Sequence, residues 1–348
     1  MTTQAEVMAI VNSIAVPSVL RGLEEMNLVR EIGITDHKVE VKLASAAINK
    51  EAQDWIKSQI ETMAGKLEGV KSVAVSFEEI SPKGINNVKH VIAIMSGKGG
   101  VGKSLVTGLT AIALRRQGHS VGILDADITG PSIPKIFGIK GNPEGNENGF
   151  LPLISNTGIE VMSVNLLLPD ENEAIIWRGP MIGKVITQFW EDVLWGNLDY
   201  LIVDLPPGTA DAPLTVLQQL PVAGIIIVTS PQDLATMIVK KAVNMAKKLN
   251  KPIIGVVENM SYLYVAEIDK KIELFGPSRA QEMAKEAGAP LIAQIPIDPE
   301  LAKLCDRGEI ELYDSKDIER LGELVVNTPL ECPQCAADCK SCNHDCHG

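Results

Sequence analysis

The segment 97–104, Gly-Lys-Gly-Gly-Val-Gly-Lys-Ser, constrains this chain more than any other part of it. It follows the apolar run 91–95 and precedes residues 105–117, whose apolar spacing predicts a helix that ends at Gly118. A strand that passes through a glycine-rich turn into a helix directs several backbone N–H groups into one concavity, where the helix dipole also favours an anion. The segment therefore predicts a phosphate-binding loop.

Every fixed position of the P-loop pattern G-x-x-x-x-G-K-[ST] is matched. Lys103 is expected to reach the β- and γ-phosphates of a nucleotide, and the Ser104 hydroxyl to coordinate Mg²⁺. An ordinary glycine-rich turn is the weaker interpretation, because the Lys-Ser pair gives the pattern its specificity. The predicted nucleotide-binding residues of the loop are Gly97, Lys98, Gly99, Gly100, Val101, Gly102, Lys103 and Ser104.

Lys98 adds a second cation to the loop. The resulting Lys-Gly-Gly-Val-Gly-Lys-Ser resembles the deviant Walker A motif of the MinD, ParA and nitrogenase iron protein class of dimeric ATPases. In that class the extra lysine reaches the nucleotide of the partner subunit, so the resemblance implies a homodimer with ATP between the subunits. It also implies that Lys98 and Lys103 neutralise the charge that develops on the γ-phosphate during hydrolysis.

The composition limits the kinds of partner and the cellular location that we expect for this protein. With 348 residues, of which 45% are hydrophobic, the chain can form two domains and a sizeable core. A net charge of −12 argues against broad binding to nucleic acid or to an anionic membrane. The sequence has no apolar run of about 18 residues and no basic-then-apolar beginning. We therefore expect a cytoplasmic protein.

Four segments are expected along the chain. Residues 1–80 carry the patterns of a small α+β domain, in which Gly69-Val70-Lys71-Ser72-Val73 resembles the closing strand of the MIP18-like domain of iron–sulfur assembly. The polar stretch 81–87 predicts a linker. Residues 88–328 alternate between strand and helix patterns, which predicts an α/β domain with a mostly parallel sheet flanked by helices. Residues 329–348 form a cysteine-rich tail.

Individual elements follow from the apolar periodicity. In the first domain we expect helices at 6–15 and 48–67 and strands at 38–43 and 70–77. The capping sequence Ser-Pro-Gln-Asp at 230–233 predicts the start of a helix that ends near Leu249. The strands expected in the larger domain are residues 88–95, 121–124, 160–164, 200–203, 224–229, 253–257 and 291–294.

Acidic residues stand where two of these strands end. In the class that the P-loop resembles, the second acid of the Asp-Ala-Asp sequence at 125–127 orients the attacking water and assists Mg²⁺, which implies that role for Asp127. Asp125 is expected to be structural. Asp204 is expected to hold Mg²⁺ through water, and Gly208 to leave a backbone N–H free for the γ-phosphate. The alternatives are a turn-forming aspartate and a solvated strand end.

Asn259 follows the predicted strand 253–257, and Pro296 lies just beyond the strand 291–294. The family resemblance implies that Asn259 contacts adenine and that Pro296 lies on the same rim of the sheet. Without the resemblance, an asparagine after a strand is simply a common turn residue.

Four motifs together look like the Mrp family of iron–sulfur carrier ATPases, a resemblance that extends roughly over residues 88–325. The motifs are Asp-Ala-Asp-Ile-x-Gly-Pro-Ser at 125–132, Trp-Arg-Gly-Pro-Met at 177–181, residues 204–209 and residues 258–261. That family has a Cys-Pro-x-Cys sequence after the last motif, which bridges a [4Fe-4S] cluster between two subunits. In this chain Val265 and Ile268 stand at about those positions.

The tail supplies the cysteines that this position lacks. Paired Cys-x-x-Cys units suit either an iron–sulfur cluster or tetrahedral zinc, and their spacing does not decide between the two. A redox-active or disordered tail is the third interpretation. The resemblance favours one [4Fe-4S] cluster shared between two subunits through Cys332 and Cys335. Cys305 is expected to be a half-buried helix residue. The predicted metal ligands in the tail are Cys332, Cys335, Cys339, Cys342 and Cys346.

The resemblance implies a slow ATPase that holds a [4Fe-4S] cluster, receives it from an assembly scaffold and transfers it to apo iron–sulfur proteins. Two alternatives stay open. One is a MinD- or ParA-type positioning or partition ATPase, for which we would expect a basic amphipathic helix or a basic face. The other is a zinc-tailed adaptor whose docking depends on ATP.

Overall fold

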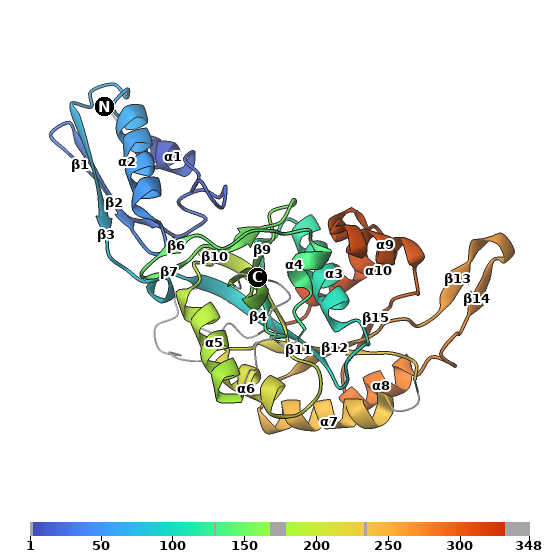
Figure 1. Cartoon of the computed structure of the whole chain (residues 1–348). Helices are drawn as coiled ribbons and strands as arrows, with labels where there is room; N and C mark the ends of the chain where they lie inside the picture. Colours follow the sequence, from blue (N-terminus) through green and yellow to red (C-terminus); the bar gives the residue numbers. More distant parts are fainter. Residues whose placement is uncertain (1–2, 129, 168–178, 233–234, 331–348) are drawn as a thin grey trace. The chain divides into compact units, whose positions relative to one another are not determined.

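The computed structural model describes residues 3–128, 130–167, 179–232 and 235–330 (Figure 1). The predictions for Trp177 and Arg178 and for the five tail cysteines lie outside the described residues. The chain divides into two compact units. Unit 1 comprises Met1–Val88, Gly141–Ile154 and Gln188–Asn197, and unit 2 comprises Lys89–Lys140, Ser155–Thr187 and Leu198–Gly348.

Unit 1 contains a three-stranded sheet in the order β1-β2-β3. β1 (Val29–Thr35) runs antiparallel to β2 (Lys38–Ala44), and β2 runs parallel to β3 (Ser72–Glu78). Buried and exposed residues alternate along β2, as in a sheet with one face on a core and the other in water. The buried residues share a core with helices α1 (Gln4–Asn12) and α2 (Lys50–Ala64).

Two later segments of the chain complete unit 1. The first of them, Gly141–Ile154, carries the short strands β6 (Gly145–Asn146), β7 (Gly149–Phe150) and β8 (Leu153–Ile154), and the second is Gln188–Asn197. Leu151 and Leu194 are buried in the same core as α1 and α2. Unit 1 therefore differs from the predicted domain 1–80, because residues distant in the sequence contribute to it.

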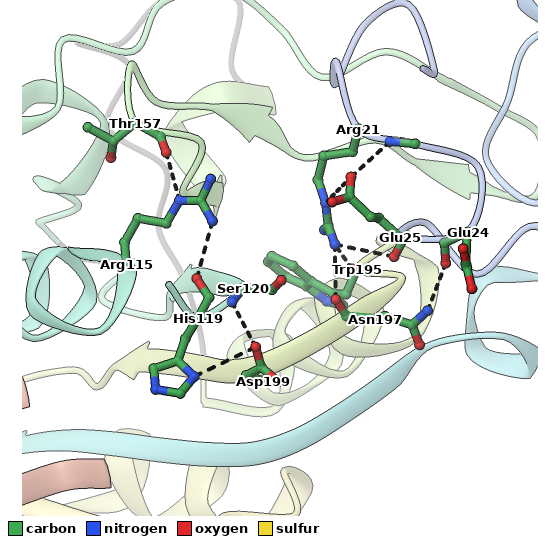
Figure 2. A network of polar contacts seen from close by, with 11 residues as sticks. Arg21, Glu24, Glu25, Arg115, His119, Ser120, Thr157, Trp195, Asn197 and Asp199 are labelled. Atoms are coloured by element: carbon green, nitrogen blue, oxygen red, sulfur yellow. Dashed lines mark hydrogen bonds and ion pairs between the residues drawn. The ribbon is translucent and has the colours of Figure 1, made fainter. Parts of the chain in front are cut away.

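The stretch predicted as a linker is part of this packing. The Asn86 side chain accepts hydrogen bonds from the N–H groups of Trp195 (2.9 Å) and Gly196 (3.1 Å), and it donates to the Val193 carbonyl (2.8 Å). Arg21 donates to the Asn197 carbonyl at 2.9 Å (Figure 2). These contacts hold the segment 193–197 within unit 1.

Unit 2 contains a parallel sheet with strands in the order β15-β12-β11-β4-β10-β5-β9. Parallel pairing joins β5 to β9 and β10, β11 to β4 and β12, and β12 to β15. Every residue of β5 and β11 is buried, because helices cover both faces of the sheet. The strands are β4 (Asn87–Ser96), β5 (Val121–Asp125), β9 (Glu160–Ser163), β10 (Asn197–Asp204), β11 (Gly224–Thr229), β12 (Ile253–Glu258) and β15 (Leu291–Gln294).

Helices lie on both sides of this sheet, with α3, α4, α9 and α10 on one side and α6, α7 and α8 on the other (Figure 1). Arg115 on α3 donates to the Thr157 carbonyl at 2.7 Å and so joins the end of the helix to the loop before β9 (Figure 2). The helices are α3 (Lys103–Arg116), α4 (Ile133–Ile136), α5 (Gly179–Asp192), α6 (Asp211–Gln219), α7 (Ala235–Lys248), α8 (Ala280–Ala287), α9 (Pro299–Arg307) and α10 (Lys316–Val326). The predicted α/β fold with a smaller α+β part is confirmed.

Some elements were not predicted. β1 and the hairpin of β13 (Leu263–Val265) and β14 (Lys270–Ile272) were missed, and helix α7 is described only from Ala235 rather than from Ser230. Ile32 is the single buried residue of β1. The sequence of this strand therefore shows only a weak apolar periodicity. Within the described residues, no helix is both long and apolar enough to span a membrane.

Candidate nucleotide site

The predicted P-loop connects β4 to α3, as its motif requires. Gly100 and Gly102 have φ values of 77° and 79°, a region that side chains with a Cβ rarely adopt. A Cβ on Gly99 or Gly100 would meet no atom within 4 Å, so there is open space beside both residues. A Cβ on Gly102 would lie 2.1 Å from the Asn259 amide nitrogen, which makes glycine necessary for a second reason.

Lys103 is buried at the start of α3, with 6% of its side chain exposed. Its ammonium lies 2.8 Å from an Asp204 oxygen and 3.4 Å from an Asp127 oxygen. Among the described residues it has these ion pairs but no hydrogen bond of regular geometry. A buried ammonium with unused donors at the base of an open loop fits an anionic phosphate group.

Ser104 and Asp204 provide neighbouring oxygen ligands. The Ser104 hydroxyl donates to one Asp204 oxygen at 2.5 Å, and the Thr107 hydroxyl donates to the other at 2.7 Å. Hydroxyl and carboxylate oxygens are the ligands that Mg²⁺ prefers, so this pair fits the predicted metal. Thr107 was not predicted, although its position one helical turn after Lys103 is a signal for the same buried face.

Asp125 supports the loop that carries Asp127. It is fully buried and accepts hydrogen bonds from the Asp127 N–H (3.2 Å) and the Ser163 hydroxyl (3.0 Å). Burial, and then the charge of the neighbouring Asp204, raise the pKa of Asp125 to about 8. The geometry therefore gives Asp125 a structural role and leaves Asp127 at the cavity.

Asn259 binds the P-loop directly. Its amide donates to the Val101 carbonyl at 2.9 Å, and the residue is 1% exposed. The preceding Glu258 is fully buried and accepts hydrogen bonds from the Ser261 and Ser278 hydroxyls at 2.5 and 2.6 Å. Glu258 therefore fixes the turn that presents Asn259 to the P-loop.

Gly208 and Lys98 both have a hydrogen-bond partner within the chain in this structure. The Gly208 N–H was expected to be free, but it donates to the Ser96 carbonyl at 3.0 Å and would have to change partner to bind a phosphate. The Lys98 ammonium donates to the Gln232 side-chain oxygen of the same chain. The predicted contact of Lys98 with a partner's nucleotide stays a prediction.

One cavity of about 690 Å³ brings most of the predicted residues together. Leu274, Phe275, Leu301 and Cys305 also line it and were not predicted, because they come from segments that only the fold brings to the P-loop. Asp204 lies behind this lining, on Lys103 and Ser104. The predicted residues on the cavity wall are Lys98, Gly99, Gly100, Gly102, Lys103, Ser104, Asp127, Asn259 and Pro296.

Comparison with known proteins agrees with this site. A family model described as "NUBPL iron-transfer P-loop NTPase" matches residues 87–327. The chain belongs to this family. A second model, described as "Iron-sulfur cluster assembly protein", matches residues 4–77 of this P-loop NTPase. The resemblance to an iron–sulfur carrier ATPase with an N-terminal MIP18-like domain is thereby confirmed.

Two curated relatives of this NTPase are each named "Iron-sulfur cluster carrier protein". The one from Synechocystis is 36% identical over 324 residues, which cover 88% of this chain and 91% of the relative. The one from Clostridium perfringens is 46% identical over 235 residues, which cover 65% and 82%.

Solved structures give the same picture for this NTPase. A nucleotide-binding protein from Archaeoglobus fulgidus in complex with ADP matches with a TM-score of 0.61 and 44% identity, over 67% of this chain and 91% of that protein. The cell division ATPase MinD from Pyrococcus furiosus matches with a TM-score of 0.50 and 22% identity, over 68% and 98%, and supports the fold alone.

Proposed function

We propose that this NTPase binds and slowly hydrolyses ATP and carries a [4Fe-4S] cluster to apo iron–sulfur proteins. The observation that carries the proposal is the meeting of Lys103, Ser104 and Asp204 at the base of the P-loop. Membership of the iron-transfer NTPase family and the names of the relatives support the cluster as cargo.

Hydrolysis would use residues from three strand ends. Ser104 and Asp204 would hold Mg²⁺, which when bound neutralises phosphate charge. Lys103 would release its ion pair with Asp127 to contact the β- and γ-phosphates, leaving the Asp127 carboxylate to orient the attacking water. Asn259 and Pro296 would border the base. Lys98 would complete the site from a second subunit of a homodimer.

The cluster would be held by the tail. Cys332 and Cys335 of both subunits would supply four thiolates, the usual complement for such a cluster. Cys339, Cys342 and Cys346 would serve as alternative or transfer ligands. An assembly scaffold would supply the cluster, and zinc in the same cysteines is the competing possibility.

The test is anaerobic reconstitution with iron and sulfide, followed by measurement of iron, sulfide, zinc and ATP hydrolysis. The variants are Cys332→Ala/Cys335→Ala and a chain that ends at Thr328. We expect both to lose the cluster and to keep nucleotide binding. Full iron and sulfide loading of the truncated chain would refute the tail as ligand. Zinc without iron in the intact chain would favour the adaptor instead.

A further inference from the structure

A second surface of unit 2 combines apolar and basic side chains. A groove of about 570 Å³ lies between the segment that begins α6 and the second half of α7. We call it the α6–α7 groove. Its lining residues are Thr209, Ala210, Leu214, Lys241, Asn244, Met245 and Lys248.

The groove combines an apolar floor with two cations. Leu214 and Met245 provide apolar surface, and Met245 is 9% exposed. Lys241, Asn244 and Lys248 are exposed and lie on one face of α7, since residues three, four and seven apart share a helix face. A ligand in the groove would therefore contact both apolar groups and ammonium groups.

The two lysines of the groove form no ion pair within the described part of the chain. Lys240, on the same helix, pairs with Glu286 at 3.5 Å, whereas Lys241 and Lys248 form no ion pair with a described residue. This is notable in a chain with a net charge of −12. The groove thus has a local positive charge that an acidic partner can neutralise.

Stabilisation of the helix dipole explains only part of this arrangement. Lys247 and Lys248 lie in the last turn of α7, where cations interact favourably with the carboxyl end of a helix. Lys241 lies two turns earlier and gains little from the dipole, which acts within the last turn. The dipole also gives no reason for an apolar groove beside the two lysines.

We propose that the α6–α7 groove docks an acidic segment of a protein partner, with apolar side chains placed between its carboxylates. The carboxylates would pair with Lys241 and Lys248, and the apolar side chains would cover Leu214 and Met245. Such a contact lies on the loop that follows Asp204, outside the cavity of the P-loop. The docking proposal goes beyond the proposed ATP binding and hydrolysis, which do not specify a protein partner for this surface.

The test measures binding of a short fluorescein-labelled peptide of repeated Glu-Glu-Leu to the full chain by fluorescence anisotropy. Lys241→Glu/Lys248→Glu should raise the dissociation constant about tenfold or more, because like charges then face each other. Lys247→Glu/Lys285→Glu makes the same change of net charge on exposed residues outside the groove, and should have less than about a twofold effect. Thermal melting and ADP binding verify that each variant is folded.

Other outcomes would overturn the proposal. Equal losses in both variants would mean that the peptide responds to net charge alone. Equal binding of a Gln-Gln-Leu peptide would remove the role of the carboxylates. Binding of phosphatidylserine vesicles without binding of the acidic peptide would assign the groove to a lipid surface. The milder Lys241→Gln/Lys248→Gln variant should give an intermediate loss, and no loss would count against docking.

Discussion

Asn259 illustrates how one side chain can serve two parts of a site. It borders the cavity and also closes the P-loop through the Val101 carbonyl. Asn259→Ala should weaken ADP binding about tenfold, since leaving a buried acceptor without a donor costs about 1–3 kcal/mol. Isothermal titration calorimetry measures the change. Asn259→Asp, which keeps the size but loses the donor, should bind at least as weakly, and normal binding by both variants would contradict this role.

The trans role of Lys98 can be tested by complementation. Lys98→Ala should slow ATP hydrolysis, because a charge-assisted phosphate contact contributes about 1.5–3 kcal/mol. Mixing it with Lys103→Ala should restore part of the activity, since each mixed dimer would then contain one complete site. Gln232→Ala, which removes only the local partner of Lys98, is the control and should stay active. No recovery on mixing would mean that Lys98 acts within its own subunit.

Asp125 predicts a pH effect on the protein without nucleotide. Its pKa is raised to about 8 by burial, while that of an unfolded aspartate is about 3.9, so the folded state holds the proton more tightly. The free energy of unfolding should therefore fall as pH rises from about 4 to about 8. Asp125→Asn should flatten this fall in melting temperature, whereas the exposed Asp211→Asn should not. Parallel curves for all three proteins would exclude this contribution.

The residues that the sequence predicted are those whose chemistry is local. The P-loop is one contiguous segment with a fixed pattern, and Asp204 is the last residue of a largely buried strand. Leu274 and Cys305 reach the site only through the fold, and their residue types also occur in any helix or loop. A sequence pattern has no signal for such positions.

Among the elements, buried strands were predicted and exposed ones were missed. β11 is buried along its whole length and reads as a continuous apolar run. The hairpin of β13 and β14 has no buried residue among those described, so burial imposed no periodicity on its sequence. Apolar residues recur periodically in a sequence where one face of a helix or strand is buried. An element with no buried face has no such pattern in its sequence.

This hairpin lies where the resembled family has its Cys-Pro-x-Cys sequence. Val265 ends β13, and Ile268 ends the 3₁₀ turn Ala266–Ile268 with 62% exposure. Val265 directly precedes this turn and lies three residues before Ile268, the spacing at which side chains along a 3₁₀ turn share one side, so we expect two thiolates at these positions to lie on the same side. In a chain that ends at Thr328, Val265→Cys/Ile268→Cys should bind iron and sulfide on reconstitution. Loading no higher than in the truncated parent would contradict this geometry.

At the scale of the whole molecule, the division of the chain changes one expectation. The linker predicted at 81–87 implies that a fragment beginning at Val88 folds and binds ATP. In the structure Leu151 and Leu194 are 2% and 0% exposed within the core of unit 1, and the fragment lacks most of that core. We expect the fragment to bind nucleotide but to aggregate, because it exposes this apolar surface.

Two substitutions should act in opposite directions. Leu151→Ser/Leu194→Ser should make the fragment more soluble but lower the melting temperature of the full chain, since each buried leucine contributes about 2–5 kcal/mol. Size-exclusion chromatography and thermal melting provide the two measurements. Improved solubility without any loss of stability in the full chain would mean that these leucines do not belong to the core.

The three-part origin of unit 1 has a consequence for synthesis on the ribosome. Its first 88 residues emerge early, but the segment Gln188–Asn197 leaves the ribosome only after more than half of the chain has been translated. Until then the core of unit 1 lacks Leu194. The nascent unit therefore exposes apolar surface, to which chaperones or neighbouring nascent chains can bind. Unit 1, although its first segment is translated early, cannot finish folding until more than half of the chain has been synthesised.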